Sequence, residues 1–372
     1  MKINIFHVVS NKYWGGPEEY AYEMVSRLKG DPRFYAEVVC KKNEPVLLHF
    51  RRLEIPISIL PLKGMTDIDS PTRLARLLRK GHNIVHVHTF SDAIAAVMAR
   101  RISENRNTRV VMTVHGICRP KTNYLYRRLY NAIDKFVFVS HRAYDEWMSH
   151  ARNFRPEQAC IIRDSVMDNP LASPAPNLRE HLHIAPDKTL IMFHGRLTPE
   201  KGVDVLLKAV TKLDKDKYHL AVIGEGKPKF MTQLKSFIVE NQLVHNVSLM
   251  GFQEDMAHII QQCDMGVLPS VEPEALGIVN LEYMMQGKPH ITTNNGAQVE
   301  YVADRRNALL VPPSDPEQLA QAIATLLDNP DQRMAMGRQA QEDFDKALNY
   351  DIFYDKMTTL YNEVLSTKRT KK

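Results

Sequence analysis

The feature of this sequence that most constrains its fold is a repeated alternation of short β-branched runs with longer amphipathic stretches. In the first half such runs lie at residues 3–9, 37–40, 57–60, 84–88, 109–114 and 135–139, with helical patterns between them, as at 17–28 and 72–79. Strands that alternate with helices favour a parallel sheet, because each crossover returns the chain to the same end. The first half is therefore predicted to be a parallel sheet with helices on both faces.

The same alternation restarts after a proline-rich interval, residues 169–176 (NPLASPAP). Further β-branched runs lie at 190–194, 219–223, 247–249, 265–268, 290–293 and 308–311. A chain of 372 residues has the length of two ordinary domains. We therefore predict an α/β protein with two Rossmann-like domains. Open parallel sheets bind ligands at the carboxyl ends of their strands, so we expect the two sheets to face a central cleft at these ends. The predicted divisions are 1–168 for the first domain, 169–187 for a linker, 188–348 for the second domain, and 349–372 for a C-terminal helix with a basic tail.

Composition narrows the class of protein. With 44% hydrophobic and 25% charged residues, the chain has the composition of a soluble globular protein. Its four cysteines, Cys40, Cys118, Cys160 and Cys263, show no C-x-x-C spacing, and we interpret them as thiols of a cytoplasmic protein. The first nine residues read as a strand rather than a signal peptide, and no apolar run approaches the roughly 18 residues of a membrane span. Any membrane contact is therefore expected to be peripheral, at the inner face of the plasma membrane.

Charge is unevenly distributed along the chain. Residues 1–170 contain 27 Lys and Arg against 17 Asp and Glu, whereas the remainder contains 22 against 26. A basic first half suits an anionic partner such as a lipid phosphate, and a solvated basic face without a partner is the alternative. Nucleic acid is not expected, because no basic run is interleaved with aromatic residues and no recognition motif is present.

The most informative segment follows the predicted strand 265–268 and reads PSVEPEALGIVNLEYMMQGKP at residues 269–289. It leads into a predicted helix, and the backbone N–H groups of Leu276, Gly277 and Ile278 at the helix start favour an anion. Glu274 lies before this helix and Glu282 lies within it, so both carboxylates could accept hydrogen bonds from one ligand. The alternative is that Glu282 is a solvated helix residue and Glu274 a helix-start charge.

A second segment, HGRLTPEKG at residues 194–202, follows the strand 190–194. A turn at Gly195 places Arg196 and Lys201 five residues apart at the carboxyl end of that strand. Two such cations could bind a diphosphate and stabilise its charge as a leaving group. A surface turn with scattered basic residues is the alternative.

The first half contains two weaker signals. Gly15, Gly16 and Glu18 belong to a G-G-P-E turn after the first strand, where a flexible loop could approach a phosphate or an acceptor. His115 ends a strand, where it could bind a sugar hydroxyl or pair with backbone. His86 and His88 alternate on one strand and would face the same side, and without an evident third ligand we interpret them as structural or cleft-lining.

Together these segments resemble the retaining glycosyltransferases of family 4, which have the two-domain GT-B fold. The carriers of the resemblance are the E-x7-E pair, the R-x4-K element, the G-G-x-E loop and the histidine at a strand end. The resemblance implies that Glu282 holds the ribose of a nucleotide, that Glu274 and His115 contact the donor sugar, and that Arg196 and Lys201 contact the donor phosphates. It also implies donor contacts from the glycine loop at Gly16 and from Gly195, base contacts near Gly224 and Phe252, an acceptor loop at residues 15–18, and no metal or other cofactor.

The sequence departs from the family pattern on the acceptor side. Glu19 and Tyr20 stand where many members carry a basic residue and a histidine, and residues 161–168 (IIRDSVMD) depart from the usual I-P-N-G-V-D. The resemblance therefore implies a nucleotide-diphosphate sugar as donor, and leaves the base, the sugar and the acceptor open. The family's habits favour a glycan or lipid-linked acceptor of the cell envelope.

The sequence also bears on the other kinds of protein that could explain these segments. The D-x-D matches at 67–69 and 214–216 are short enough to arise by chance, and no G-x-G-x-x-G, Walker A or G-x-S-x-G element is present. A nucleotide-sugar epimerase or a phosphorylase of the same fold would keep the same cations. A non-catalytic sugar-nucleotide-binding module would not need both cations and both glutamates.

Overall fold

The chain divides into two compact units, which are described separately. The computed structural model describes residues 2–12, 14–64, 66–151, 154–168 and 177–367. One unit comprises Met1–Asp164 and Asp351–Lys372, and the other is the continuous segment Ser165–Tyr350. The proline-rich stretch 169–176 and the basic tail 368–372 lie outside the described residues.

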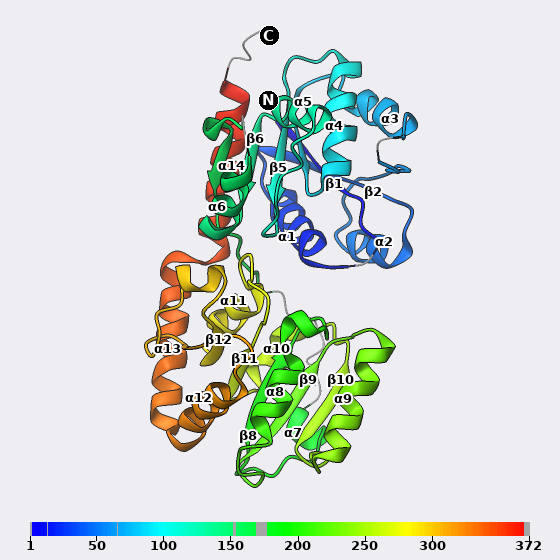
Figure 1. The fold of residues 1–372 in the computed structure, drawn as a ribbon. Coiled ribbons are helices and arrows are strands. Elements are labelled where there is room, and N and C mark those ends of the chain that lie inside the picture. The colour runs from blue at the N-terminus through cyan, green and yellow to red at the C-terminus, as the bar shows by residue number, and fades with distance from the viewer. Residues whose placement is uncertain (1, 13, 65, 152–153, 169–176, 368–372) are drawn as a thin grey trace. The chain divides into compact units, whose positions relative to one another are not determined.

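Within its described residues, the first unit is built on a seven-stranded parallel sheet with the order β3-β2-β1-β4-β5-β6-β7 (Figure 1). The connections run outward in both directions from the neighbours β1 and β4, as in a Rossmann fold. The strands are β1 Ile3–Val9, β2 Phe34–Cys40, β3 Ile57–Ile59, β4 His82–Val87, β5 Thr108–Val114, β6 Lys135–Phe138 and β7 Ala159–Ile161.

Helices flank this sheet, and the last of them comes from the end of the chain. They are α1 Gly16–Lys29, α2 Glu44–Arg51, α3 Asp69–Leu77, α4 Phe90–Ser103, α5 Tyr124–Ala132, α6 His141–His150 and α14 Tyr350–Ser366. From Asp351 onward α14 belongs to this unit. Tyr361 is fully buried, and its hydroxyl lies 2.7 Å from His86 Nδ1 on β4. The hydroxyl of Tyr354 donates a hydrogen bond to Asp31, just after α1, at 2.9 Å. Helix α14 is therefore joined to this unit by polar contacts as well as by apolar packing.

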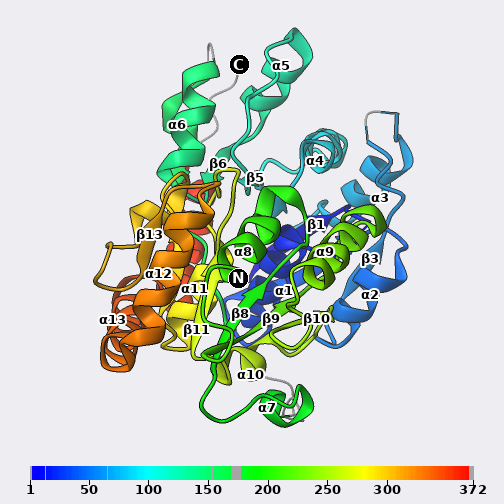
Figure 2. The same ribbon diagram turned by 60° about the horizontal axis from the view of Figure 1, so that its bottom comes forward.

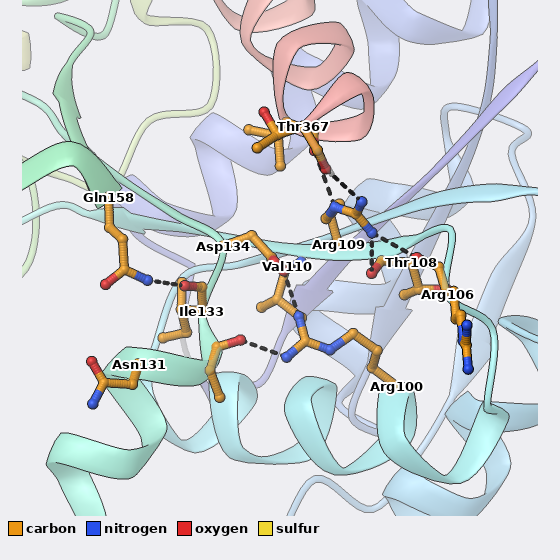
Figure 3. A network of polar contacts seen from close by, with 12 residues as sticks. Arg100, Arg106, Thr108, Arg109, Val110, Asn131, Ile133, Asp134, Gln158 and Thr367 are labelled. Carbon is orange, nitrogen blue, oxygen red and sulfur yellow. Dashed lines mark hydrogen bonds and ion pairs between the residues drawn. The ribbon is translucent and has the colours of Figure 1, made fainter. Parts of the chain in front are cut away.

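Arg109 on β5 fixes the carboxyl end of α14 (Figure 3). Its guanidinium donates to the carbonyls of Val364 at 3.0 Å and Thr367 at 2.9 Å, and also to that of Arg106 at 2.7 Å. A cation at this position satisfies carbonyls that have no intrahelical donor and complements the helix dipole. Nearby, the buried Arg100 pairs with Asp134 and joins the end of α4 to the start of β6.

The second unit has a six-stranded parallel sheet across its described residues, with the order β10-β9-β8-β11-β12-β13. The strands are β8 Thr189–His194, β9 Tyr218–Ile223, β10 Val247–Gly251, β11 Met265–Leu268, β12 His290–Thr293 and β13 Leu309–Val311. Alternate residues of β8 serve opposite faces. Ile191 and Phe193 belong to one apolar core, and Leu190 and Met192 belong to another.

Helices cover both faces of this second sheet. Figure 2 shows α8, α9 and α12 (green to orange), which pack on one of these faces. They are α7 Leu178–His181, α8 Val203–Val210, α9 Pro228–Glu240, α10 Met256–Gln261, α11 Ile278–Met285, α12 Pro316–Asp328 and α13 Pro330–Ala347. Val203, Leu206 and Val210 of α8 pack into the first core. Leu178 of α7 packs into the second core, so residues 177–187, which were assigned to a linker from the sequence, carry part of this unit.

The predicted fold class, α/β with two Rossmann-like parallel-sheet domains, is confirmed. Most strand predictions agree within two or three residues, because continuous β-branched runs buried on both faces are what a central parallel strand requires. The edge strand β7 was not predicted. It has three residues, all only half-buried, and therefore lacks the apolar run that marks the central strands.

Candidate functional site

The carboxyl edge of the second sheet brings together the loops that carry most of the predicted site residues. Strands β8 and β11 are neighbours whose connections run in opposite directions, and such a switch point is where open α/β sheets bind ligands. Gly195 follows β8, Gly224 follows β9, and Ser270 and Glu274 follow β11.

Two of the predicted glycines let these loops approach one another. Gly224 has φ +134°, and a Cβ added there would lie 1.8 Å from the carbonyl oxygen of Gly195. Its N–H donates to the carbonyl of Gly251 at 2.8 Å, while the N–H of Gly195, which has φ +135°, donates to that of Ile223 at 3.0 Å. A side chain at Gly224 would push the turns after β8 and β9 apart.

The start of α11 is held in a fixed position by its neighbours. Gly277 caps the helix with φ +81°, and the hydroxyl of Tyr301 donates to the carbonyl of Leu276 at 2.6 Å. Leu276 and Gly277 are buried, whereas Ile278 is half-buried. The amide of Asn280 donates to the carbonyl of Gly277 at 2.9 Å, whereas the amides of residues 276–278 come before any intrahelical acceptor. This helix start can therefore receive an anionic or hydroxyl ligand.

Lys201 and Glu274, which are 73 residues apart in the sequence, form a direct ion pair. Lys201 Nζ lies 2.6 Å from Glu274 Oε1, and the hydroxyl of Ser270 donates to the same oxygen. The side chains are 21% and 12% exposed, so water screens this contact only partly. The surrounding backbone is also joined, because the N–H of Val271 donates to the carbonyl of Glu200 at 2.9 Å.

Glu282 is held by a second network that the sequence did not reveal. Its Oε2 lies 2.6 Å from His194 Nε2, and His194 Nδ1 lies 2.9 Å from the hydroxyl of Tyr283. That hydroxyl donates to the carbonyl of Met192 at 2.9 Å and so must accept from His194 Nδ1. Side-chain exposure is 6% for His194 and 26% for Glu282, which leaves Glu282 accessible to a ligand.

The other two side chains predicted in this unit lie more openly. Arg196 is exposed, and its side chain has no hydrogen-bond partner among the described residues, whereas its carbonyl accepts from the N–H of Thr198 at 3.1 Å. Phe252, just after β10, is 56% exposed. An exposed cation and an exposed ring beside ordered loops are available to a ligand.

In the first unit, His115 ends a chain of three histidines on neighbouring strands. His115 Nε2 lies 3.0 Å from His88 Nδ1, and His88 Nε2 lies 3.1 Å from His7 Nδ1. Burial, and to a lesser extent His115, lower the pKa of His7 to about 3, and burial lowers the pKa of His115 to about 3. The pKa of His88 also lies well below its usual value because of burial and the neighbouring histidines. All three rings are therefore neutral near pH 7.

The glycine loop of this unit leads into α1. Gly15 caps the helix in an extended conformation, and Gly16 has open space where a Cβ would lie. Glu18 does not project from the loop. It is 1% exposed, and its Oε1 accepts from Asn11 Nδ2 at 2.6 Å. Burial raises the pKa of Glu18 to about 7, and the nearby Asp92 contributes in the same direction.

The structure also assigns places to residues that sequence analysis had set aside. His86 bonds Tyr361 and Thr113, at 2.7 Å each, as a structural residue would. Asp67, the first residue of one D-x-D match, accepts from the backbone and hydroxyl of Ser70 and from the backbone of Lys63. The D-x-D match at 214–216 lies in a turn, since Asp214 Oδ1 accepts from the N–H of Asp216 at 3.0 Å, whereas Asp69 of the other match begins α3.

Three partners of the predicted site residues were not predicted from the sequence: Ser270, His194 and His7. His7 and His88 stand at inward positions of neighbouring strands, and a fixed strand order would have suggested their contact. The structure joins Lys201 directly to Glu274, while Glu282 has its own partners and Arg196 contacts neither pair. His115 and the glycine loop belong to the other unit.

The chain is similar to known proteins both in sequence and in fold. Residues 14–166 match the model of Glycosyltransferase Family 4, and residues 175–343 match that of Glycosyl transferases group 1. An uncharacterized glycosyltransferase of Methanocaldococcus jannaschii is 25% identical over 95% of this chain and 95% of its own length. The GDP-mannose-dependent alpha-(1-6)-phosphatidylinositol monomannoside mannosyltransferase of Mycobacterium tuberculosis is 25% identical over 88% of this chain and 89% of its own. The structure of Anabaena HepE in complex with UDP-glucose has a TM-score of 0.82 and 18% identity, over 97% of this chain and 99% of that one.

Two Rossmann-like domains with this strand order and these relatives define a glycosyltransferase of the GT-B fold. The two family models lie end to end along most of the chain. The chain belongs to glycosyltransferase family 4, and it is an enzyme that transfers sugars. Across the part of the chain that the structure describes, none of the helices has both the length and the apolar character of a membrane span.

Proposed function

We propose that this enzyme transfers a sugar from a nucleotide-diphosphate sugar to a hydroxyl group, with retention of the anomeric configuration and without a metal ion or other cofactor. The observation that carries the proposal is the Lys201–Glu274 pair at the carboxyl edge of the second sheet, beside the start of α11. A cation, a carboxylate and a helix start at one edge suit a ligand that combines phosphates with sugar hydroxyls. HepE, which has the same fold, is found with UDP-glucose.

Each residue has a proposed role toward the donor. Arg196 and Lys201 bind the diphosphate, Glu274 and His115 bind the donor sugar, and Glu282 binds the ribose through the oxygen that His194 does not hold. The amides of residues 276–278 face the donor, and the backbone at Gly16 and Gly195 also contacts it. Gly224 and Phe252 lie toward the base. Glu18 supports the acceptor loop at Gly15 and Gly16 without contacting the acceptor, since its carboxyl group is buried and accepts a hydrogen bond from Asn11.

The proposed reaction breaks the bond between the anomeric carbon and the diphosphate oxygen, and forms a bond to the acceptor oxygen on the same face. The acceptor's proton passes to the leaving phosphate oxygen. As that oxygen gains negative charge, Arg196 and Lys201 stabilise it, and such electrostatic contacts are typically worth about 3 kcal/mol each. Asp67 and Asp214, the first residues of the two D-x-D matches, accept hydrogen bonds from neighbouring residues of the chain, and this supports a reaction without a metal ion.

The proposed acceptor is a glycan or lipid-linked glycan of the cell envelope, reached by peripheral contact with the inner face of the plasma membrane. The relative in Mycobacterium tuberculosis acts on a phosphatidylinositol mannoside. In this chain, α5 exposes Tyr124 and Leu125, at 61% and 60%, beside the exposed Arg127 and Arg128. Exposed apolar groups among cations suit an anionic lipid surface. Sedimentation with vesicles containing anionic lipid, compared with neutral vesicles, tests this contact.

The central test follows the anomeric proton by NMR, with a panel of nucleotide sugars and acceptors in excess EDTA. We expect a product with the donor's configuration and no loss of rate on chelation. Inversion would refute the front-face reaction, and a rate that falls with EDTA and returns with a divalent ion would refute metal independence. Conversion of the donor without any acceptor would instead indicate an epimerase, and a requirement for inorganic phosphate would indicate a phosphorylase.

The roles of the cations are tested by Lys201→Met, with Lys208→Met as the matched control. Lys208 lies on α8 in an exposed pair with Asp204 and faces no predicted site residue. We expect turnover to fall by about 100-fold or more for Lys201→Met and to stay near that of the parent enzyme for Lys208→Met. Equal turnover in both variants would remove Lys201 from the proposed site.

A further inference from the structure

His115 is the exposed end of a buried line of imidazole rings. His7 is fully buried, His88 is 7% exposed, and His115 is half-buried. The ring of Tyr20 packs edge-on against His115 at 5.0 Å and against His88 at 5.3 Å, which limits rotation of both rings. Each ring therefore meets the next through one defined pair of nitrogens.

The hydrogen-bond count in this line leaves only two arrangements. A neutral imidazole has one N–H and one bare nitrogen, so each contact between rings needs a donor on one side and an acceptor on the other. In one arrangement all N–H groups point from His7 toward His115, which then carries its own hydrogen on Nδ1. In the other they all point toward His7, and the Nδ1 of His115 is bare.

The inner end of the line distinguishes between these arrangements. His7 Nε2 is buried and, among the described residues, has no hydrogen-bond partner. The second arrangement would place an N–H at this position without an acceptor, whereas the first leaves only a bare ring nitrogen. Buried donors without partners are rarer in proteins than buried acceptors without partners, so the first arrangement is favoured.

We propose that His7 and His88 act as positioning residues that fix His115 as the Nδ1–H tautomer, so that it presents a hydrogen-bond donor to its ligand. At this end of the line, Nδ1 of His115 has no partner among the described residues. A donor at that position selects an oxygen with a free lone pair, such as a sugar hydroxyl or a leaving phosphate oxygen. It does not suit a role for His115 as a base.

This inference deepens the proposed function, because the ligand of His115 is taken to be the donor sugar. The tautomer itself is measured without any ligand. In protein labelled with 15N-histidine, long-range proton–nitrogen correlation spectra distinguish a protonated ring nitrogen from a bare one. We expect the Nδ1 of His115, assigned with His115→Gln, to be protonated at pH 7.

Variants of the inner residues test whether the line causes this preference. His88→Phe keeps a ring but removes both nitrogens, and we expect a mixed His115 tautomer together with a fall in kcat of about 10-fold, with a smaller change in KM. His7→Phe should act in the same direction, and His7→Asn, whose amide can donate to His88, should restore the parent tautomer. Wild-type His115 with a bare Nδ1, or an unchanged tautomer in both phenylalanine variants, would overturn the inference.

His86→Phe is the structural control. His86 packs against the rings of His7 and His88, but its hydrogen bonds go to Tyr361 and Thr113. Because phenylalanine keeps the ring contacts and removes only those two bonds, the variant should lower stability and leave the His115 tautomer unchanged. Titration with nucleotide sugars separates this inference from the proposed function. A protonated Nδ1 that responds to the inner variants but to no nucleotide sugar would uphold the positioning role and refute the donor contact of His115.

Discussion

Replacing Lys201 with methionine in the absence of any donor measures how strongly this residue and Glu274 depend on each other. At their separation of 2.6 Å, two unit charges attract by about 6 kcal/mol at an effective dielectric constant of about 20, and the loss of hydration offsets most of this. Lys201→Met leaves Glu274, 12% exposed, with the hydroxyl of Ser270 as a side-chain partner. We expect it to lower the free energy of unfolding by about 3 kcal/mol.

The double-mutant cycle isolates the pair. Glu274→Gln keeps the shape and one hydrogen-bond acceptor, and we expect it to cost about 2 kcal/mol, because Lys201 is then left without its counter-charge. The double variant should cost about as much as Lys201→Met alone, which corresponds to a coupling of about 2 kcal/mol.

The assay is urea unfolding followed by far-UV circular dichroism, because both tryptophans, Trp14 and Trp147, lie in the first unit and report on that unit alone. The same variants should lose transferase activity, and the double variant should be about as stable as Lys201→Met and no more active. Additive costs in the cycle would refute the conclusion that the ion pair is a significant contact in the ligand-free enzyme.

Three further predictions concern stability. Gly224→Ala should lower the free energy of unfolding by about 3 kcal/mol, because its Cβ would lie 1.8 Å from the carbonyl oxygen of Gly195. Thermal unfolding checks this. Gly16→Ala is the control, because a Cβ at Gly16 meets open space. Arg109→Met should lower the urea midpoint seen by tryptophan fluorescence by the equivalent of about 2 kcal/mol, because the carbonyls at the end of α14 lose their donor; an unchanged midpoint would refute the anchoring role. Burial raises the pKa of Glu18 from 4.5 to about 7, so the folded state binds more protons than the unfolded state between these values, and stability should fall by about 2 kcal/mol as pH rises through this window. Unfolding at pH 5 and pH 8 should show a smaller fall in Glu18→Gln, and an equal fall would contradict the assignment.

The sequence was sufficient to predict the fold class because the strands of a doubly covered parallel sheet are continuous apolar runs, and because glycines and cations cluster at their carboxyl ends. The sequence predicted Lys201 and Glu274 as residues of one site, but their direct contact depends on β8 and β11 being neighbours although 70 residues separate them in the sequence. The burial of Glu18 could not be predicted, since a glutamate in the first turn of a helix is usually solvated.

Polar partners inside the sheet were the least predictable part. His7 and His88 are 81 residues apart, and periodicity shows only that each points to one face. Their contact requires the strand order and the register, in which His7 of β1 stands opposite His86 of β4. For the same reason His194 could not be recognised as the partner of Glu282, although it directly precedes Gly195 and Arg196 in the sequence.

The position of α14 affects the order in which the protein can fold during synthesis. The first unit lacks this helix until residues 351–366 have been made, whereas the second unit is a continuous segment that is complete by residue 350. At ribosomal rates of about 5 to 20 residues per second, the N-terminal sheet waits roughly 10 to 40 s for its last helix. During that interval, the surface later covered by Phe353 and Tyr361 is open to chaperones and to other nascent chains. A chain that stops between residues 350 and 366 would therefore carry a complete C-terminal domain attached to an N-terminal domain without its last helix.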